Sequence, residues 1–174
     1  MLLTHLGFPH DFIKWIMCCI TSVSYNILIN GSISNFFHAE RGLKQGCPLS
    51  SLIFLLIMEG LSRLISEERN QGRTKGVKIA VNVTLSHLLF VCDILICLNG
   101  TISDSIVFNV ILKLFYKATG MERHQEKSTL LDTGCTLYEL NFAKQRIPYR
   151  LLAFEDGLKY LGFQLKPNNY KIVD

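Results

Sequence analysis

The sequence has little charge, and this scarcity excludes one class of protein at once. Charged residues make up 18% of the 174 positions, whereas apolar residues make up 49%. A disordered segment needs the opposite balance, because it lacks the apolar surface that offsets the entropy lost on ordering. We therefore expect a folded chain with a hydrophobic core.

The six cysteines show neither a metal-binding nor a secretory pattern. None forms a Cys-x-x-Cys pair, and their spacing does not match that of a zinc site. The opening segment MLLTHLGFPHDFIKWI is interrupted by polar and charged residues, including Asp11 and Lys14, so it lacks the apolar core of a signal peptide. Without a secretory signal, we expect an intracellular protein with reduced thiols.

The apolar runs are too short for a membrane-spanning helix. Crossing a bilayer takes about 20 consecutive, mostly apolar residues. The longest run, Leu52 to Met58, is followed by Glu59. A second run, Leu85 to Leu98, contains His87 and Asp93. The sequence therefore predicts no membrane partner.

Charge alone does not select a partner. The formal net charge of +4 is compatible with a nucleic-acid partner, but the lysines and arginines are scattered and form no basic tail. An ordinary basic surface and a phosphate-binding groove both stay open at this point.

Apolar spacing predicts helices that alternate with hairpins. Helices are expected over residues 9–24, 50–70 and 104–119, and strands over residues 77–83 and 160–165. The long helix is expected to be capped by Ser50 or Ser51 and to be largely buried, because it is apolar around most of its circumference. Two hairpins are expected, one turning at Asn30-Gly31 and one at Cys92-Asp93. The elements follow no strict strand–helix–strand period, so the predicted class is α+β.

Asp93 lies between two short apolar runs, Leu85–Val91 and Ile94–Leu98. Burying an ionised carboxylate without partners is unfavourable, so we expect Asp93 at an exposed hairpin tip. The local pattern leaves two interpretations open. Asp93 is either a turn residue, which aspartate commonly is, or a metal-binding carboxylate held by two strands.

Four blocks, in order along the chain, resemble the reverse transcriptases of plant non-LTR (LINE-type) retrotransposons. LSHLLFVCDILICLNG is similar to the catalytic hairpin of that family, whose tip reads aromatic-x-Asp-Asp. RGLKQGCPLSSLIFLLIMEGLSRLI is similar to the loop and helix that precede it. GMERHQEKS and YLGFQLKPNNYK resemble two later motifs.

This resemblance implies a partial polymerase palm over residues 1–174. The palm is expected over about 1–135, and the transition to the thumb over about 136–174, with a primer-grip-like segment near 158–166. The fingers, most of the thumb and a strand carrying a further metal-binding aspartate are expected to lie outside this sequence.

The resemblance places Phe90-Val91-Cys92-Asp93 on the aromatic-x-Asp-Asp positions. Asp93 is then the surviving catalytic carboxylate and the only part left of an incomplete metal site, and Cys92 marks the position of the lost one. In the family, such carboxylates hold two Mg²⁺ ions during nucleotidyl transfer. Magnesium prefers hard oxygen ligands, so a thiol is a poor substitute. We expect a polymerase that is catalytically inactive.

The resemblance also implies nucleotide- and template-binding residues in the loop before the long helix, namely Arg41, Gln45 and Gly46. Lys127 matches a lysine that acts as a general acid toward the leaving pyrophosphate. Its role is expected to matter little without metal-bound substrate.

The turn Tyr160-Leu161-Gly162 resembles the primer grip of the family. The implied ancestral partners are an RNA template and a DNA primer, and Mg²⁺ is the ancestral cofactor. Self-association through an exposed sheet edge is also expected, because the strand that would cover the catalytic hairpin lies outside this sequence.

Two alternatives to a degenerate polymerase stay open. The chain is either a nucleic-acid-binding remnant that no longer catalyses, or the product of a relic open reading frame without a selected role. A cysteine hydrolase is a weaker enzyme alternative, because no Cys–His–acid arrangement has supporting context in the sequence.

Overall fold

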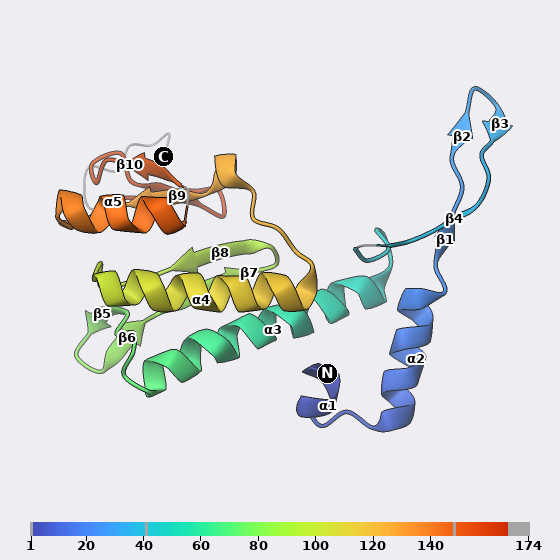
Figure 1. Ribbon diagram of the computed structural model, residues 1–174, viewed down its shortest axis with the longest axis horizontal. Coiled ribbons are helices and arrows are strands. Elements are labelled where there is room, and N and C mark those ends of the chain that lie inside the picture. The colour runs from blue at the N-terminus through green and yellow to red at the C-terminus, as the bar shows by residue number, and fades with distance from the viewer. Residues whose placement is uncertain (1, 41, 148, 167–174) are drawn as a thin grey trace. The chain divides into compact units, whose positions relative to one another are not determined.

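The computed structural model describes residues 2–40, 42–147 and 149–166 (Figure 1). The chain divides into two compact units, Met1–Gly60 and Leu61–Asp174. Helix α3 (Pro48–Asn70) is continuous through the boundary and contributes residues to both units.

The first unit begins with two helices, α1 (Leu2–His5) and α2 (His10–Thr21). Pro9 precedes α2 with φ −58°, a value that suits the start of a helix. The apolar stripe of α2 buries Ile13 and Ile16. The predicted helix over 9–24 is confirmed, although it ends earlier, at Thr21.

Four short strands follow and pair antiparallel, two by two. Strand β1 (Ser24–Tyr25) pairs with β4 (Phe37–His38), and β2 (Leu28–Ile29) pairs with β3 (Ser32–Ile33). Asn30 and Gly31 connect β2 to β3 with φ values of 49° and 82°. Positive φ at both central residues is the requirement of a type I′ turn, so the predicted hairpin is confirmed.

Two expectations for α3 are wrong. The helix begins at Pro48 rather than after a cap at Ser50 or Ser51, because proline has the φ of a first turn and needs no hydrogen-bond acceptor there. The helix is also not largely buried, since Leu52 is 59% exposed. One stripe faces inward, and it consists of Ile53, Met58, Leu61 and Ile65.

By length and composition, α3 is the one helix in the described part of the chain that could cross a membrane. The core helix of a soluble protein can have the same length and composition. Within the second unit, the C-terminal half of α3 carries polar contacts to strands: the Arg69 guanidinium donates to the backbone carbonyl of Thr84 at 3.3 Å.

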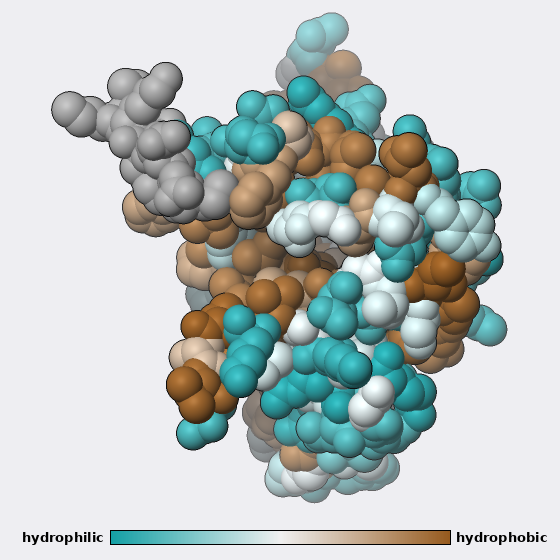
Figure 2. All heavy atoms as spheres, turned by 90° about the vertical axis from the view of Figure 1, so that its left-hand side faces the viewer, coloured by the Kyte–Doolittle hydropathy of each residue, from teal (hydrophilic) through white to brown (hydrophobic). Residues whose placement is uncertain are grey.

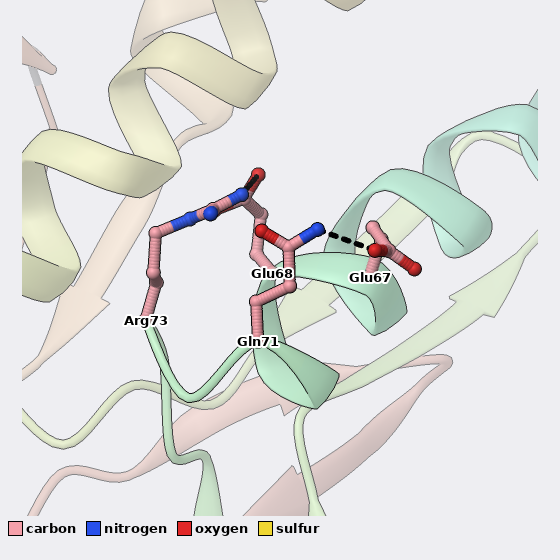
Figure 3. A network of polar contacts seen from close by, with 4 residues as sticks. All are labelled: Glu67, Glu68, Gln71 and Arg73. Carbon is pink, nitrogen blue, oxygen red and sulfur yellow. Dashed lines mark hydrogen bonds and ion pairs between the residues drawn. The ribbon is translucent and has the colours of Figure 1, made fainter.

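A polar network closes the C-terminal end of α3 (Figure 3). The Arg73 guanidinium donates to both carboxylate oxygens of Glu68, and the Gln71 amide donates to the Glu67 carboxylate. The Arg73 contact holds the pKa of Glu68 below its usual range. The network fixes the chain where it leaves the helix toward the next strand.

Two hairpins follow α3 in the second unit. Strand β5 (Val77–Ala80) pairs with β6 (Val83–Leu85), and β7 (His87–Phe90) pairs with β8 (Asp93–Ile96). The single strand expected over 77–83 is therefore wrong, because the chain reverses between Ala80 and Val83. An alternating pattern does not distinguish one strand from two when the turn itself contains an apolar residue, here Val81.

Helix α4 (Ile102–Thr119) matches its prediction closely. The Thr101 hydroxyl caps its start by accepting from the backbone N–H of Asp104, and Gly120 ends it in a left-handed conformation with φ 69°. Ile111, Leu112 and Phe115 are buried and supply much of the core of the second unit.

The stretch from 129 to 155, which shows no clear pattern in sequence, contains a strand–helix–strand unit. Strand β9 (Thr129–Leu131) pairs parallel to β10 (Arg150–Leu152), and α5 (Leu137–Arg146) connects them and packs against α4. Thr136 and Glu139 form a capping box at the start of α5.

The last elements of the described residues are β11 (Leu158–Tyr160) and β12 (Phe163–Leu165), which pair antiparallel. The single strand expected over 160–165 is wrong, because Leu161 and Gly162 have φ values of 52° and 87° and reverse the chain. Within the described residues the strands form six two-stranded sheets among the helices. The α+β class is confirmed.

Candidate functional site

The hairpin β7–β8 places Cys92 and Asp93 at its tip. Phe90 pairs directly with Asp93, which leaves Val91 and Cys92 as a two-residue turn. Both Cys92 and Asp93 are exposed. The prediction that these residues lie at the exposed tip of an antiparallel hairpin is confirmed.

The turn is strained at Val91, which has φ 50°. A β-branched residue rarely adopts positive φ, because its side chain collides with its own backbone there. Such a conformation costs about 1–3 kcal/mol and occurs most often at functional sites. The only sign of this strain in the sequence is a valine at a position where tight turns favour Asn or Gly.

His87 anchors the base of this hairpin. The Ser62 hydroxyl of α3 lies 2.9 Å from His87 Nε2, and the Ser86 hydroxyl lies 2.9 Å from His87 Nδ1. Ser86 is 8% exposed, and its backbone carbonyl accepts from the N–H of Cys97 at 2.8 Å. The Ser62 contact connects β7 to α3. The Cys97–Ser86 hydrogen bond continues the antiparallel pairing beyond the end of β8. Sequence reasoning treated His87 only as an interruption of an apolar run.

The segment after β8 is fixed by a buried carboxylate. Asp104, 3% exposed, accepts the backbone N–H of Asn99 at 3.1 Å. The Cys135 thiol lies 3.8 Å from the carbonyl of Gly100. A Cβ at Gly100 would lie 2.5 Å from that sulfur, so only glycine fits this approach without movement. The segment that follows the hairpin is therefore fixed by contacts at Asn99 and at Gly100.

Tyr160 and Asp93, two of the residues singled out in the sequence, lie close enough to interact electrostatically. Burial and the negative charge of Asp93 both raise the pKa of the Tyr160 phenol, and burial is the larger cause. Tyr160 ends β11, and the Leu161-Gly162 turn follows it directly. The Tyr160 phenol is therefore within the range over which the charge of Asp93 acts on it.

Lys127 lies at the end of a short 3₁₀ helix, η1 (Gln125–Lys127). Its side chain is exposed, and its backbone N–H donates to the carbonyl of His124 at 3.2 Å. This location fits a solvated lysine, and a role as a general acid stays a prediction.

Gln45 and Gly46 form an exposed turn in the first unit, just before α3. Gly46 has φ 77°, a left-handed value that favours glycine, and a Cβ there would meet no atom within 4 Å. The open surface allows close approach of a ligand to the backbone. Arg41, the third residue predicted for this loop, lies outside the described residues.

The residues at the hairpin tip do not fit a magnesium pair. Asp93 offers one carboxylate, whereas Cys92 offers a thiol, which is a poor ligand for a hard cation. In the part of the chain that the structure describes, no group of three or more His, Cys, Asp or Glu side chains is arranged to hold a metal ion.

Comparison with known proteins places these features in a family. Residues 2–165 match the family model described as reverse transcriptase (RNA-dependent DNA polymerase). Over 88 residues, half of this chain, the sequence is 32% identical to the retrovirus-related Pol polyprotein from type-1 retrotransposable element R2 of Popillia japonica. Over 67 residues, 38% of this chain, it is 40% identical to an uncharacterized mitochondrial protein of Arabidopsis thaliana.

The chain spans only part of these relatives, 14% of the polyprotein and 55% of the mitochondrial protein. The family model, in contrast, covers nearly the whole chain, from the first residue of α1 to the end of β12. The resemblance to retrotransposon reverse transcriptases seen in the sequence motifs is confirmed. The chain belongs to the reverse transcriptase (RNA-dependent DNA polymerase) family and is a fragment of LINE-type retrotransposon ancestry.

Proposed function

We propose that this chain derives from an enzyme that copied RNA into DNA, and that it no longer catalyses nucleotide addition. The observation that carries the proposal is the hairpin tip: Asp93 stands at the tip of β7–β8, and a cysteine stands where a second carboxylate is needed. Phosphoryl transfer depends on positioned charge, and a tip with one carboxylate supplies too little of it.

The proposed roles follow from this arrangement. Asp93 is the remaining catalytic carboxylate, Cys92 occupies the lost position, and Tyr160-Leu161-Gly162 is the remnant of a primer grip. The closeness of Tyr160 to Asp93 supports this, since a primer end has to lie beside the reacting metal site. Gln45 and Gly46 are proposed to face the nucleotide or template.

The proposed architecture is a partial palm, with the transition to the thumb beginning near residue 136. The strained hairpin, the helices α3 and α4, and the hairpin β11–β12 support this proposal. Mg²⁺ is the cofactor of the ancestral reaction, and an RNA template and a DNA primer are its partners.

The test is primer extension on an RNA template with labelled deoxynucleotides, in Mg²⁺ or Mn²⁺. We expect no extension by the unchanged chain, and none by Cys92→Asp. The variant restores one carboxylate, but the described residues place no third ligand beside it. A known reverse transcriptase serves as the positive control. Template-dependent extension by the unchanged chain, after contaminating polymerase is removed, would contradict the proposal.

A second candidate is binding of nucleic acid without catalysis. Lys159 is an exposed cation of β11, and the chain has a formal net charge of +4, which favours contact with phosphate groups. Binding of an RNA–DNA duplex should then weaken steeply as salt rises, because phosphate contacts release counterions. Binding that is absent at low salt would remove this candidate.

Self-association is the remaining proposed interaction. Many apolar side chains are exposed in this chain, and Figure 2 shows several of them between hydrophilic residues on one face. The β2–β3 hairpin carries Leu28 and Ile33, both 69% exposed, and within the described residues no further strand pairs with its outer edges. Light scattering should therefore show association above the monomer mass, and a monodisperse monomer would contradict it.

A further inference from the structure

A small hollow in the first unit lies between the end of α2, the β1–β4 pair and the start of α3. Its volume is about 50 Å³, and apolar side chains such as Ile20, Val23 and Ile53 form much of its wall. Two cysteines also line it, Cys19 from α2 and Cys47 from the position just before α3. Cys19 and Cys47, which are 28 residues apart in the sequence, therefore line the same small hollow.

The Cys47 thiol is activated by its surroundings. The backbone N–H groups of Ser50 and Leu49, in the first turn of α3, and the positive charge of Lys44 favour its thiolate form. These contacts lower the pKa of Cys47 below its ordinary value. By contrast, burial raises the pKa of Cys97 and of Cys135. The thiolate is the form that attacks disulfides, so Cys47 is expected to react with disulfides faster than Cys97 or Cys135.

We propose that Cys19 and Cys47 form a reversible disulfide across this hollow, with a low-molecular-weight disulfide as the oxidant. The Cys47 thiolate attacks one sulfur of the oxidant, forms a mixed disulfide and releases one small thiolate. The Cys19 thiolate then attacks the Cys47 sulfur and releases the second. The two protein thiols lose two electrons and two protons, and the oxidant is reduced to two small thiols.

The bond would tie α2 to the loop that carries Gln45 and Gly46. Because that loop leads directly into α3, oxidation would restrict its movement and protect it from proteolysis. This device is independent of the chemistry at the Cys92-Asp93 tip, and it stands whether or not the chain binds nucleic acid.

Cys18 is a matched control supplied by the chain itself. Successive residues of an α-helix point about 100° apart, and the hollow is lined by Cys19 and not by Cys18. In an unfolded chain the two positions pair with Cys47 almost equally well, since loop-closure entropy changes little with one extra residue. A preference for Cys19 therefore has to come from the fold.

The experiment treats the full chain with oxidised glutathione, blocks free thiols, and maps disulfide-linked peptides by mass spectrometry, with fragmentation to separate Cys18 from Cys19. We expect the Cys19–Cys47 link to exceed the Cys18–Cys47 link by roughly tenfold in the folded chain, because disulfide geometry is narrow. In guanidinium the two yields should become equal.

The variants Cys18→Ser and Cys19→Ser give an independent readout, and circular dichroism confirms that each keeps the helix content of the unchanged chain. Cys18→Ser should retain the bond to Cys47, and Cys19→Ser should lose it. Equal yields in the folded chain, or no link to Cys47 in either the unchanged chain or Cys18→Ser, would overturn the proposal.

Discussion

The two hairpin tips at Asn30-Gly31 and Val91-Cys92 have the same length and different chemistry. Asn30 and Gly31 are the residues that a type I′ turn favours, and both have positive φ. Val91 also has positive φ, but as a β-branched residue it is strained there. The residues of the first turn favour its backbone conformation, whereas the second turn depends on contacts with the structure around it.

The surroundings of the second tip explain how it is held. His87 is bonded through both ring nitrogens, and Asp104 fixes the segment that leaves β8. In the reverse transcriptase family this tip carries the catalytic carboxylates. The difference therefore teaches that a strained turn can persist where hydrogen bonds around its hairpin hold it in place. Under the proposed function, Cys92 in this turn occupies the position of a lost metal ligand.

The largest expected effect on stability is at the relaxed tip. Gly31→Val should lower the free energy of unfolding by about 1–3 kcal/mol, because Gly31 has φ 82° and valine is strained there. A Cβ at Gly31 meets no atom within 4 Å, so the loss reports the backbone alone. Urea unfolding measures it, and Ser32→Val in the adjoining strand is the control. An equal loss of stability in both variants would contradict the claim that positive φ at Gly31 causes the effect.

The opposite change is expected at the strained tip. Val91→Gly should raise the free energy of unfolding by up to about 1 kcal/mol, because glycine adopts positive φ without a clash. Val83→Gly is the matched control, since Val83 is 50% exposed and Val91 53% exposed, and Val83 lies within a strand. The control should be destabilising. A loss of stability in Val91→Gly would show that Val91 is not strained.

The smallest effect concerns a polar contact distant from either turn. Arg73 lowers the pKa of Glu68, so the carboxylate stabilises the fold above its unfolded pKa of about 4.3, and this contribution is lost as pH falls through the lower folded pKa. Glu68→Gln should cost about 0.5 kcal/mol at neutral pH. Urea unfolding at pH 7 and pH 3 should show the difference only at pH 7. A difference of the same size at both pH values would exclude an ionic origin.

The parts of the fold set by local chemistry could be predicted from the sequence. Asn30-Gly31 produced its hairpin, Gly120 ended α4, and Asp93 came to an exposed tip. Helix α5 was missed although Thr136 and Glu139 carry the spacing of a capping box, because few apolar residues follow at helical intervals.

Features that depend on distant partners could not be predicted. The exposure of Leu52 on α3 depends on which side of the helix is covered by the rest of the chain. The reversals at 81–82 and at Leu161-Gly162 lie inside alternating apolar segments that read as single strands. The nearness of Tyr160 to Asp93 joins segments far apart in sequence, and no local pattern encodes it.

The most direct test of the account is divalent cation binding at the Cys92-Asp93 tip. Mn²⁺ is titrated into the unchanged chain, Cys92→Asp, and the double variant Cys92→Asp with Asp93→Asn, and paramagnetic broadening of the β7–β8 signals reports binding. We predict that Cys92→Asp binds at least about tenfold more tightly than the unchanged chain, because a carboxylate replaces a thiol, and that the double variant loses the gain. Equal Mn²⁺ affinity in the unchanged chain and Cys92→Asp would contradict the claim that Cys92 marks a lost metal ligand.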